Sequence, residues 1–223
     1  MVLSRKYYTM LGVSPEAQEY RLNECCSFRK AEGTWGPLSN LSTRYPFKLN
    51  GVQVHTTEAL FQALRFPEHP VTQELVLLPT SPVQAKTQAK KLLGSQSRRD
   101  FDEIKLELMY WCLRVKFIKH YGSMGDMFDK SGDREIVELT ANDSYWGCIE
   151  DKEDKNKAKG QNMMGKLLMK LRSFYNDTRA TGEFMFVEPL EIADFKLKGQ
   201  DIGRVEHPVW SKKFAAPASS DAV

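Results

Sequence analysis

The longest periodic segment of the chain, residues 100–121, most constrains the fold, because its apolar side chains recur at the mixed three- and four-residue spacing of a helix. These side chains are Ile104, Leu108, Met109, Trp111, Cys112, Val115 and Phe117. A second clear helix is predicted over about residues 162–175, where one face carries Met163, Met164, Leu167, Leu168 and Leu171. A third helical pattern covers residues 82–93. Helices therefore dominate the predicted fold.

The clearest β signal is the dipeptide Asn50-Gly51, which favours the tight turn of a hairpin within residues 44–55. The flanking apolar positions are Phe47, Leu49, Val52 and Val54. A helix is predicted to open near Thr56-Thr57 and to run to about Phe66, because Pro67 and Pro70 follow. Shorter elements are a helix or strand at 134–139, a strand at 184–187 and one helical turn after Ser14-Pro15. The predicted class is α+β, a mainly α-helical single domain with small β-hairpins.

The composition is ordinary for a globular protein, with 223 residues, 41% hydrophobic and 27% charged. No apolar run approaches the ~18–20 residues of a membrane helix, and the first ten residues carry no apolar stretch typical of a signal peptide. We therefore expect a soluble protein with no membrane partner and, by default, a cytoplasmic location. The formal charge of +3 does not demand a nucleic-acid partner. The sequence indicates no oligomeric state.

Basic residues nevertheless gather in two places, residues 152–159 and a group formed by Lys86, Lys90, Lys91, Arg98 and Arg99. Such groups usually form solvated faces, and binding of anionic phosphates is the second interpretation. The four cysteines show neither zinc-ligand spacing nor a neighbouring histidine that suggests a catalytic pair. We therefore predict no metal site.

Residues 57–66 place three polar side chains, Glu58, Gln62 and Arg65, on one helical stripe, with an apolar stripe beside it. One interpretation is an exposed polar face whose glutamate is favoured by the helix dipole. The other is a pocket wall, where a carboxylate, an amide and a guanidinium could handle a proton, a ribose hydroxyl and a phosphate. The spacing alone favours the first.

The segment 142–147 also has two interpretations. Asp143 can be a turn-former that bonds its own backbone, whereas Tyr145 and Trp146 beside it can anchor a core or stack a base. Trp35, which precedes Gly36-Pro37, poses the same alternatives. Residues 160–166 lead into the last predicted helix, whose first N–H groups can hold a phosphate, although capping alone also explains this sequence.

Taken in order, these segments resemble the NADAR family, the YbiA-like N-glycosidases. The matching pieces are WGPLSNL (35–41), PFKLNG (46–51), TEALFQALRF (57–66), SPVQAK (81–86), RRDFDEIKLELM (98–109), KF (116–117), VE (137–138), NDSYWG (142–147) and GQNMMGKLLMKLR (160–172). The resemblance implies a catalytic domain over residues 28–175. A segment 1–27 precedes it, and an extension 176–223 with an Ala/Ser-rich, disordered end follows.

What the resemblance implies is hydrolysis of an N-glycosidic bond without metal or redox cofactor. Family substrates are phosphoribosylated pyrimidine intermediates of riboflavin synthesis, or ADP-ribose attached to guanine bases. Glu58 and Asp143 match the family's two carboxylates and are the implied catalytic residues. The resemblance also implies Asn40, Trp146, Gly160 and Asn162 as substrate-binding residues, and the helical stripe adds Gln62 and Arg65 as further candidates. Gly165 also falls on a family motif.

The sequence departs from the family at Ala59, at Arg65 where a lysine is common, at Phe101, and after Gly147, where a glycine-rich run is replaced. These departures argue against the riboflavin-pathway substrate. The basic segments favour a polyanion, so ADP-ribosylated guanine, within nucleic acid, is the preferred substrate. The alternatives are a phosphoribosylated riboflavin-pathway intermediate and a non-catalytic module that binds ADP-ribose or nucleic acid. Should a lysine act covalently, Lys86 and Lys159 are the candidates.

Cleavage of an N-glycoside requires a proton for the leaving atom and negative charge near the electron-poor carbon. We assign the role of general acid/base to Glu58, and the orientation of water or the stabilisation of the cation to Asp143. The reverse assignment of these two roles remains open. A helix N-terminus lowers the pKa of a carboxyl, so an acid role for Glu58 requires burial or the nearby Asp143. Trp146 or Trp35 would stack the base, and Arg65 with residues 160–165 would hold phosphate.

Overall fold

The computed structural model describes residues 5–92, 96–181 and 185–208. Its α-helices are α1 (Arg5–Leu11), α2 (Thr57–Ala63), α3 (Pro70–Leu77), α4 (Pro82–Lys91), α5 (Phe101–Lys119), α6 (Tyr121–Ser131) and α7 (Met163–Thr178). The five strands of its main sheet are β1 (Gln18–Arg21), β2 (Cys26–Arg29), β5 (Ile136–Thr140), β6 (Cys148–Glu150) and β7 (Lys157–Gly160). Two 3₁₀ turns are η1 (Leu22–Glu24) and η2 (Gly36–Leu38).

The remaining strands form three two-stranded pieces. They are β3 (Phe47–Leu49) with β4 (Val52–Val54), β8 (Phe186–Val187) with β11 (Val205–Glu206), and β9 (Lys196–Leu197) with β10 (Gln200–Asp201). In the β3–β4 turn, Asn50 and Gly51 have φ values of 48° and 74°. Both residues are therefore in the left-handed conformation that a type I′ turn requires, which confirms the predicted hairpin.

The main sheet has the order β1-β7-β6-β5-β2. The pairs β1–β7 and β7–β6 are antiparallel, whereas β6–β5 and β5–β2 are parallel. Because β2 and β5 run in the same direction, their carboxyl ends meet at one edge of the sheet. Such an edge is a common place for a ligand site in mixed α/β structures.

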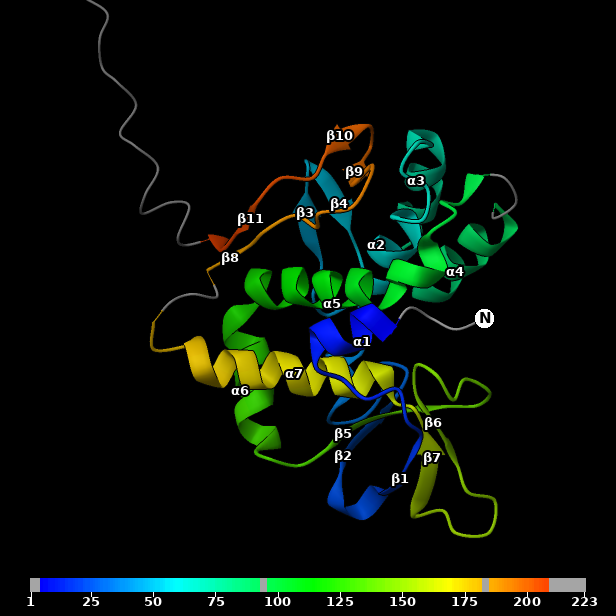
Figure 1. Ribbon diagram of the computed structural model, residues 1–223, viewed down its shortest axis with the longest axis vertical. Coiled ribbons are helices and arrows are strands. Elements are labelled where there is room, and N and C mark those ends of the chain that lie inside the picture. Colours follow the sequence, from blue (N-terminus) through cyan, green and yellow to red (C-terminus); the bar gives the residue numbers. More distant parts are fainter. Residues whose placement is uncertain (1–4, 93–95, 182–184, 209–223) are drawn as a thin grey trace, which may run out of the picture.

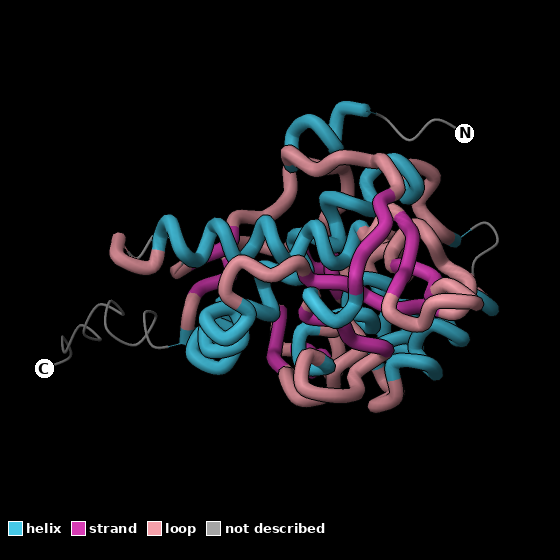
Figure 2. The backbone as a smooth tube through the Cα atoms, turned by 90° about the horizontal axis from the view of Figure 1, so that it is seen from below, coloured by secondary structure: helices cyan, strands magenta, loops and turns pink. Residues whose placement is uncertain are grey.

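Helices cover this sheet and then continue as a second layer. α7 packs on β5, α5 packs on α7, and α2 packs on the other side of α5 together with α3 and α4 (Figure 1). Figure 2 gives the perpendicular view, and the first and last described residues lie apart in both views. The long helix α5 therefore connects the sheet half of the molecule to the α2–α4 half. It also buries Trp111 against Phe195, and Phe117 against Phe128 and Tyr175.

The structure confirms the predicted α+β class and most long helices, although their ends differ by a few residues. The helix expected after Ser14-Pro15 is wrong, since α1 ends at Leu11 and the chain continues into β1. Besides the predicted small hairpins, the structure contains a sheet in which five short strands join. Segment 134–139 contains most of strand β5, which pairs with β6 and β2, is almost wholly buried and lacks a strand's usual alternation. The expected disordered end, 209–223, lies outside the described residues.

The segment before residue 28 is part of the main sheet, since it supplies β1 and the first half of β2. The extension after residue 175 likewise packs on the domain, because β8 and β11 both contact α5. Among the described helices, none is long and apolar enough to cross a membrane. In the same part of the chain, no group of three His, Cys, Asp or Glu side chains could hold a metal ion.

Candidate active site

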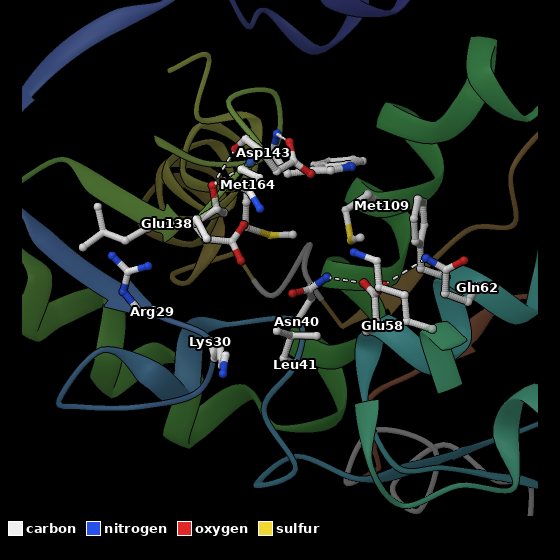
Figure 3. Close-up of a pocket in the computed structure, with 17 residues that line it drawn as sticks. Arg29, Lys30, Asn40, Leu41, Glu58, Gln62, Met109, Glu138, Asp143 and Met164 are labelled. Carbon is white, nitrogen blue, oxygen red and sulfur yellow. Dashed lines mark hydrogen bonds between the residues drawn. The ribbon is translucent and has the colours of Figure 1, made fainter. Parts of the chain in front are cut away.

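A cavity of about 370 Å³ lies between the carboxyl ends of β2 and β5 and the helices α2, α4, α5 and α7 (Figure 3). Its lining is Arg29, Lys30, Asn40, Leu41, Glu58, Phe61, Gln62, Lys86, Met109, Glu138, Leu139, Thr140, Ala141, Asn142, Asp143, Trp146 and Met164. Carboxylates and cations both occur in this lining, and apolar side chains fill the space between them. The cavity therefore has the composition of a site for a polar small molecule or group.

Glu58 is held in the first turn of α2, where Thr56 caps the helix by accepting a hydrogen bond from Ala59 N at 3.1 Å. Its side chain is only 4% exposed, and two amides donate to it. Asn40 Nδ2 lies 2.6 Å from Oε2, and Gln62 Nε2 lies 2.9 Å from Oε1 (Figure 3). Burial raises the pKa of Glu58, although Lys86, the Gln62 hydrogen bond and Arg65 oppose that effect. Glu58 and Gln62 therefore line a cavity, as the pocket-wall interpretation expects, whereas Arg65 of the same stripe does not belong to the lining.

A buried lysine holds the loop that carries Asn40 in place. Lys116, in the last turn of α5, donates hydrogen bonds from Nζ to three consecutive carbonyls of residues 37–39, at 2.8, 3.2 and 2.9 Å. Burial lowers the pKa of this amine to about 7. The Asn40 carbonyl in turn accepts a hydrogen bond from Glu58 N at 2.9 Å. Lys116 thus contributes to the site indirectly, by ordering the backbone that precedes Asn40.

Asp143 performs the turn-forming role and lines the cavity as well. Its Oδ1 accepts hydrogen bonds from the backbone N–H groups of Tyr145 at 3.0 Å and Trp146 at 2.9 Å. Thr140 Oγ1 closes the same loop by donating to the Asp143 carbonyl at 2.7 Å. The loop carbonyls of Tyr145 and Trp146 then accept from Met163 N and Met164 N at the start of α7. Asp143 therefore both forms the turn and contributes to the wall of the cavity.

Glu138, on β5, is a cavity carboxylate that the sequence reasoning did not select. It lies across the cavity from Glu58 in Figure 3 and is 7% exposed. Within the described part of the chain, no donor forms a hydrogen bond to its carboxylate. Burial and the charges of Glu58 and Asp143 raise its pKa to about 7. The only sequence signal was the Val137-Glu138 pair within the family resemblance, because a glutamate in a short apolar strand has no spacing that marks it as functional.

The Glu138→Gln substitution is expected to stabilise the protein at pH 8 and to have little effect near pH 4.5. The native pKa of about 7 lies above the ordinary glutamate pKa of 4.5, so the native state binds more protons between these values and stability falls as pH rises. This difference in pKa corresponds to a change of at most about 3 kcal/mol in the free energy of unfolding. Thermal unfolding at both pH values measures it, with the exposed Glu24→Gln as the control. A Glu138→Gln protein no more stable than wild type at pH 8 contradicts the expectation.

Three cationic side chains face the cavity. Arg29 and Lys30 lie at the carboxyl end of β2, and Lys86 lies on α4. Arg29 also forms an ion pair with Glu150 on β6. Of the two amine candidates named from the sequence, Lys86 lies at the site, whereas Lys159 lines a separate hollow of about 460 Å³ beside β6 and β7. Lys30 was not selected from the sequence, and its φ of 51° is unusual for a residue with a side chain.

The sequence model of the NADAR domain matches residues 27–175 of the chain. The chain belongs to the NADAR family. "N-glycosidase YbiA" of Shigella flexneri is 30% identical over 146 residues, which span 66% of this chain and 85% of that protein. The maize "Riboflavin biosynthesis protein PYRR, chloroplastic" is 29% identical over 175 residues, 73% of this chain but only 27% of that protein. The NMR structure of Escherichia coli YbiA has a TM-score of 0.57 and 27% identity, covering 70% of this chain and 86% of that one.

Within this NADAR domain, the structure brings Asn40, Glu58, Gln62, Asp143 and Trp146 together around one cavity. Trp146 packs edge-on against Phe61, with ring centroids 5.8 Å apart. The other tryptophan proposed to stack a base does not belong to the cavity lining. Trp35 instead packs against the Arg134 guanidinium, 5.0 Å from its ring centroid. Of these two tryptophans, Trp146 is the one that lines the cavity.

Three other residues expected to bind substrate lie outside the cavity lining, and each has a structural role. Asn162 is wholly buried, donates to the Ile136 carbonyl at 2.9 Å and accepts from Glu138 N at 3.2 Å. Gly160 lets β7 approach β6, since a Cβ there would lie 2.3 Å from the Gly147 carbonyl oxygen. Arg65 bonds Gln62 and stacks on Phe101. The sequence predicts a phosphate site at residues 160–165, formed by free N–H groups at the start of α7. In the structure these first N–H groups donate instead to carbonyls of the preceding loop.

Proposed function

We propose that this NADAR protein is an N-glycosidase that hydrolyses a ribose–nitrogen bond in a nucleotide-like substrate. The observation that carries the proposal is the buried Glu58, which faces a cavity whose opposite wall supplies Glu138 and Asp143. Two carboxylates in different environments can divide the work of an acid and of a base or charge stabiliser. The name of the related YbiA proteins, N-glycosidase, supports the same reaction.

The reaction begins as the bond between C1′ of the ribose and the base nitrogen breaks. The electron pair stays with the nitrogen, which receives the proton of Glu58. The ribose then carries an oxocarbenium-like positive charge, and the Asp143 and Glu138 carboxylates stabilise that charge. A water molecule attacks C1′ and gives its proton to one of these carboxylates. The products are the free base and a ribose with a hydroxyl at C1′. The carboxylate that accepted the proton of the water releases it to solvent, and Glu58 regains its proton from solvent.

The environment of Glu58 suits an acid role at neutral pH. Its place in the first turn of α2 would lower the pKa of the carboxyl. Burial acts in the opposite direction and is the largest influence on this group, with a smaller contribution from the Asp143 charge. An acid with a raised pKa retains its proton closer to neutral pH, which general acid catalysis requires.

ADP-ribosylated guanine is the substrate that we favour. Lys86 lies at the cavity, and α4 continues from it to Lys90 and Lys91, so basic charge extends from the site along this helix. Trp146 can stack on the guanine, and Arg29 with Lys30 can attract the pyrophosphate. The second basic segment supports a polyanion less well, because its Lys157 pairs with Glu19 at 3.7 Å.

A phosphoribosylated pyrimidine intermediate is the second candidate, because the maize relative is named a riboflavin biosynthesis protein. A smaller substrate would use fewer phosphate contacts, so the two candidates differ in their expected dependence on salt. Steep loss of kcat/KM with rising salt is expected for an ADP-ribosylated oligonucleotide. A shallow dependence is expected for a free phosphoribosylated pyrimidine.

The test is a product assay of the purified protein on three substrates: a guanine-ADP-ribosylated oligonucleotide, the same oligonucleotide without ADP-ribose, and a phosphoribosylated aminopyrimidine. Release of ADP-ribose from the first alone supports the favoured substrate. Release of ribose phosphate from the third alone supports the second candidate. If neither is hydrolysed while ADP-ribose binds tightly in calorimetry, the protein is a binding module, and the proposed activity is rejected.

A further inference from the structure

Two hydrogen bonds connect Arg65, which follows the C-terminal end of α2, through Gln62 to Glu58. Arg65 Nη1 donates to Gln62 Oε1 at 3.1 Å, and Gln62 Nε2 donates to Glu58 Oε1 at 2.9 Å. Gln62 and Glu58 both line the cavity, whereas Arg65 does not belong to its lining. Arg65 therefore acts on the cavity through Gln62.

The guanidinium of Arg65 decides which way the Gln62 amide points. A guanidinium carries donors and no acceptor, so only the carbonyl oxygen of Gln62 can face it. The amide nitrogen must then face Glu58, and Glu58 Oε1 is a hydrogen-bond acceptor in this arrangement. An acceptor oxygen in this position cannot also hold a proton that points toward the same amide. A proton on Glu58 is thereby directed to the other oxygen, Oε2.

The other oxygen of Glu58, Oε2, contacts the side-chain amide of Asn40, whose orientation is not fixed by a guanidinium. Asn40 Nδ2 lies 2.6 Å from Oε2. Among the described residues, no donor forms a hydrogen bond to the Asn40 side-chain oxygen. The Asn40 amide can therefore turn and present its oxygen to a protonated Oε2, or its nitrogen to an ionised one. The two oxygens of Glu58 differ because Arg65 fixes one neighbouring amide and leaves the other free.

Packing holds the Arg65 guanidinium in place. It lies over the Phe101 ring, 4.0 Å from the centroid, and Phe101 packs against Phe61 in the cavity wall with ring centroids 5.3 Å apart. The Arg65 carbonyl also accepts a hydrogen bond from Arg98 N at 2.8 Å. Cation–π contacts of this kind restrict the position of the guanidinium plane.

From this geometry we infer that Arg65 is a positioning residue, which orients Gln62 so that Glu58 Oε1 is a dedicated acceptor and Oε2 is the oxygen that carries the transferred proton. The inference deepens the proposed function and rests on it for the word "transferred". The orientation itself exists with or without turnover, so it can be measured on the resting protein. Arg65 thus orients Gln62, whereas the sequence suggested that Arg65 holds phosphate.

Other charged or titratable groups around Glu58 must be kept constant in the test. They are Lys86 on α4, Asp143 after β5, Glu138 on β5 and Cys112 on α5. Lys86 and Arg65 favour the ionised Glu58, whereas Asp143 opposes it. A substitution of Arg65 therefore removes both a direct charge effect and the orientation of Gln62. A double-mutant cycle separates these two effects.

The experiment follows the Glu58 carboxyl by ¹³C NMR across pH in protein labelled at glutamate, with the signal assigned by its loss in Glu58→Gln. In Arg65→Met the titration midpoint of Glu58 is expected to move upward by roughly one pH unit, as expected for loss of a nearby opposite charge and a donor. In a Gln62→Met background the same substitution is expected to cause less than half of that shift. Equal shifts in both backgrounds, or no shift in a folded Arg65→Met protein, overturn the inference.

Two further variants complete the design. Arg98→Met removes a guanidinium that bonds Asp100 instead of Gln62, and it is expected to leave the midpoint unchanged. Arg65→Lys keeps the charge and a donor, and it is expected to restore most of the wild-type midpoint. If Arg65→Met does not fold, Arg65→Gln takes its place in the same cycle. Because the titration needs no substrate, a failure of the N-glycosidase assay leaves this result interpretable.

Discussion

Glu58→Gln is expected to lower kcat by about 10²–10⁴-fold while the fold is retained, as is typical for loss of a general acid or base. The substitution keeps the shape of a side chain that is 4% exposed, and it replaces the titratable carboxyl with an amide. It also removes the proton that the leaving base nitrogen requires. The measurement is product release by wild type and variant under single-turnover conditions, on whichever substrate the product assay identifies.

The matched control for this prediction is Glu107→Gln. Glu107 is a half-buried glutamate on α5 whose pKa is also raised by burial, but it does not belong to the cavity lining. It is expected to keep wild-type activity. The native fold of each variant is checked by circular dichroism and by its thermal unfolding curve. Wild-type turnover by a folded Glu58→Gln protein would remove Glu58 from the mechanism.

Gly165→Ala is expected to destabilise the protein by about 3 kcal/mol or more. A Cβ at this position in α7 would lie 2.0 Å from the Ile136 carbonyl oxygen and about as close to both polar atoms of the Asn162 amide, at 2.5 and 2.6 Å. The carbonyl belongs to the backbone of β5, so relief of the clash requires α7 to move away from the sheet. Overpacking of a buried contact costs about 1–3 kcal/mol, and more when the backbone is involved.

Thermal unfolding measures this effect, and for a chain of this length each kcal/mol corresponds to roughly 2–4 °C in Tm. Gly122→Ala is the matched control, since Gly122 lies in helix α6 and a Cβ there has nothing within 4 Å. That variant is expected to have an unchanged or slightly higher Tm, because alanine favours the helix. A Tm for Gly165→Ala equal to that of the control would show that β5 and α7 can separate at no cost.

The site itself was only partly predictable. Asn40, Glu58, Gln62, Asp143 and Trp146 were named from motif resemblance, and the structure places all five around one cavity. The helical spacing of Glu58 and Gln62 on one stripe was also informative. Spacing alone gave no means of deciding whether that stripe faced solvent or a cavity, because an exposed polar face has the same pattern.

Other functional features had no local signal. Glu138 lies in a short buried strand, and Lys116 lies in the last turn of a helix, where a lysine is ordinarily an exposed residue that favours the helix dipole. Lys116 is instead matched to three carbonyls of residues 37–39, almost 80 positions earlier in the sequence. The charge of Arg65 suggests a phosphate ligand in the sequence, because its contact with the Phe101 ring exists only in the folded structure.

Local chemistry by itself determined the elements whose stability depends on neighbours in the sequence. The Asn50-Gly51 turn, the Thr56 cap and the long helix α5 were all predictable, because turn preference, capping and helical periodicity act over a few residues. Only the tertiary structure decided the five-stranded sheet, in which β2 pairs with β5 across more than 100 residues. It also decided which carboxylates lie buried together, because burial depends on what packs around a side chain, and that in turn sets the charge state on which the proposed chemistry depends.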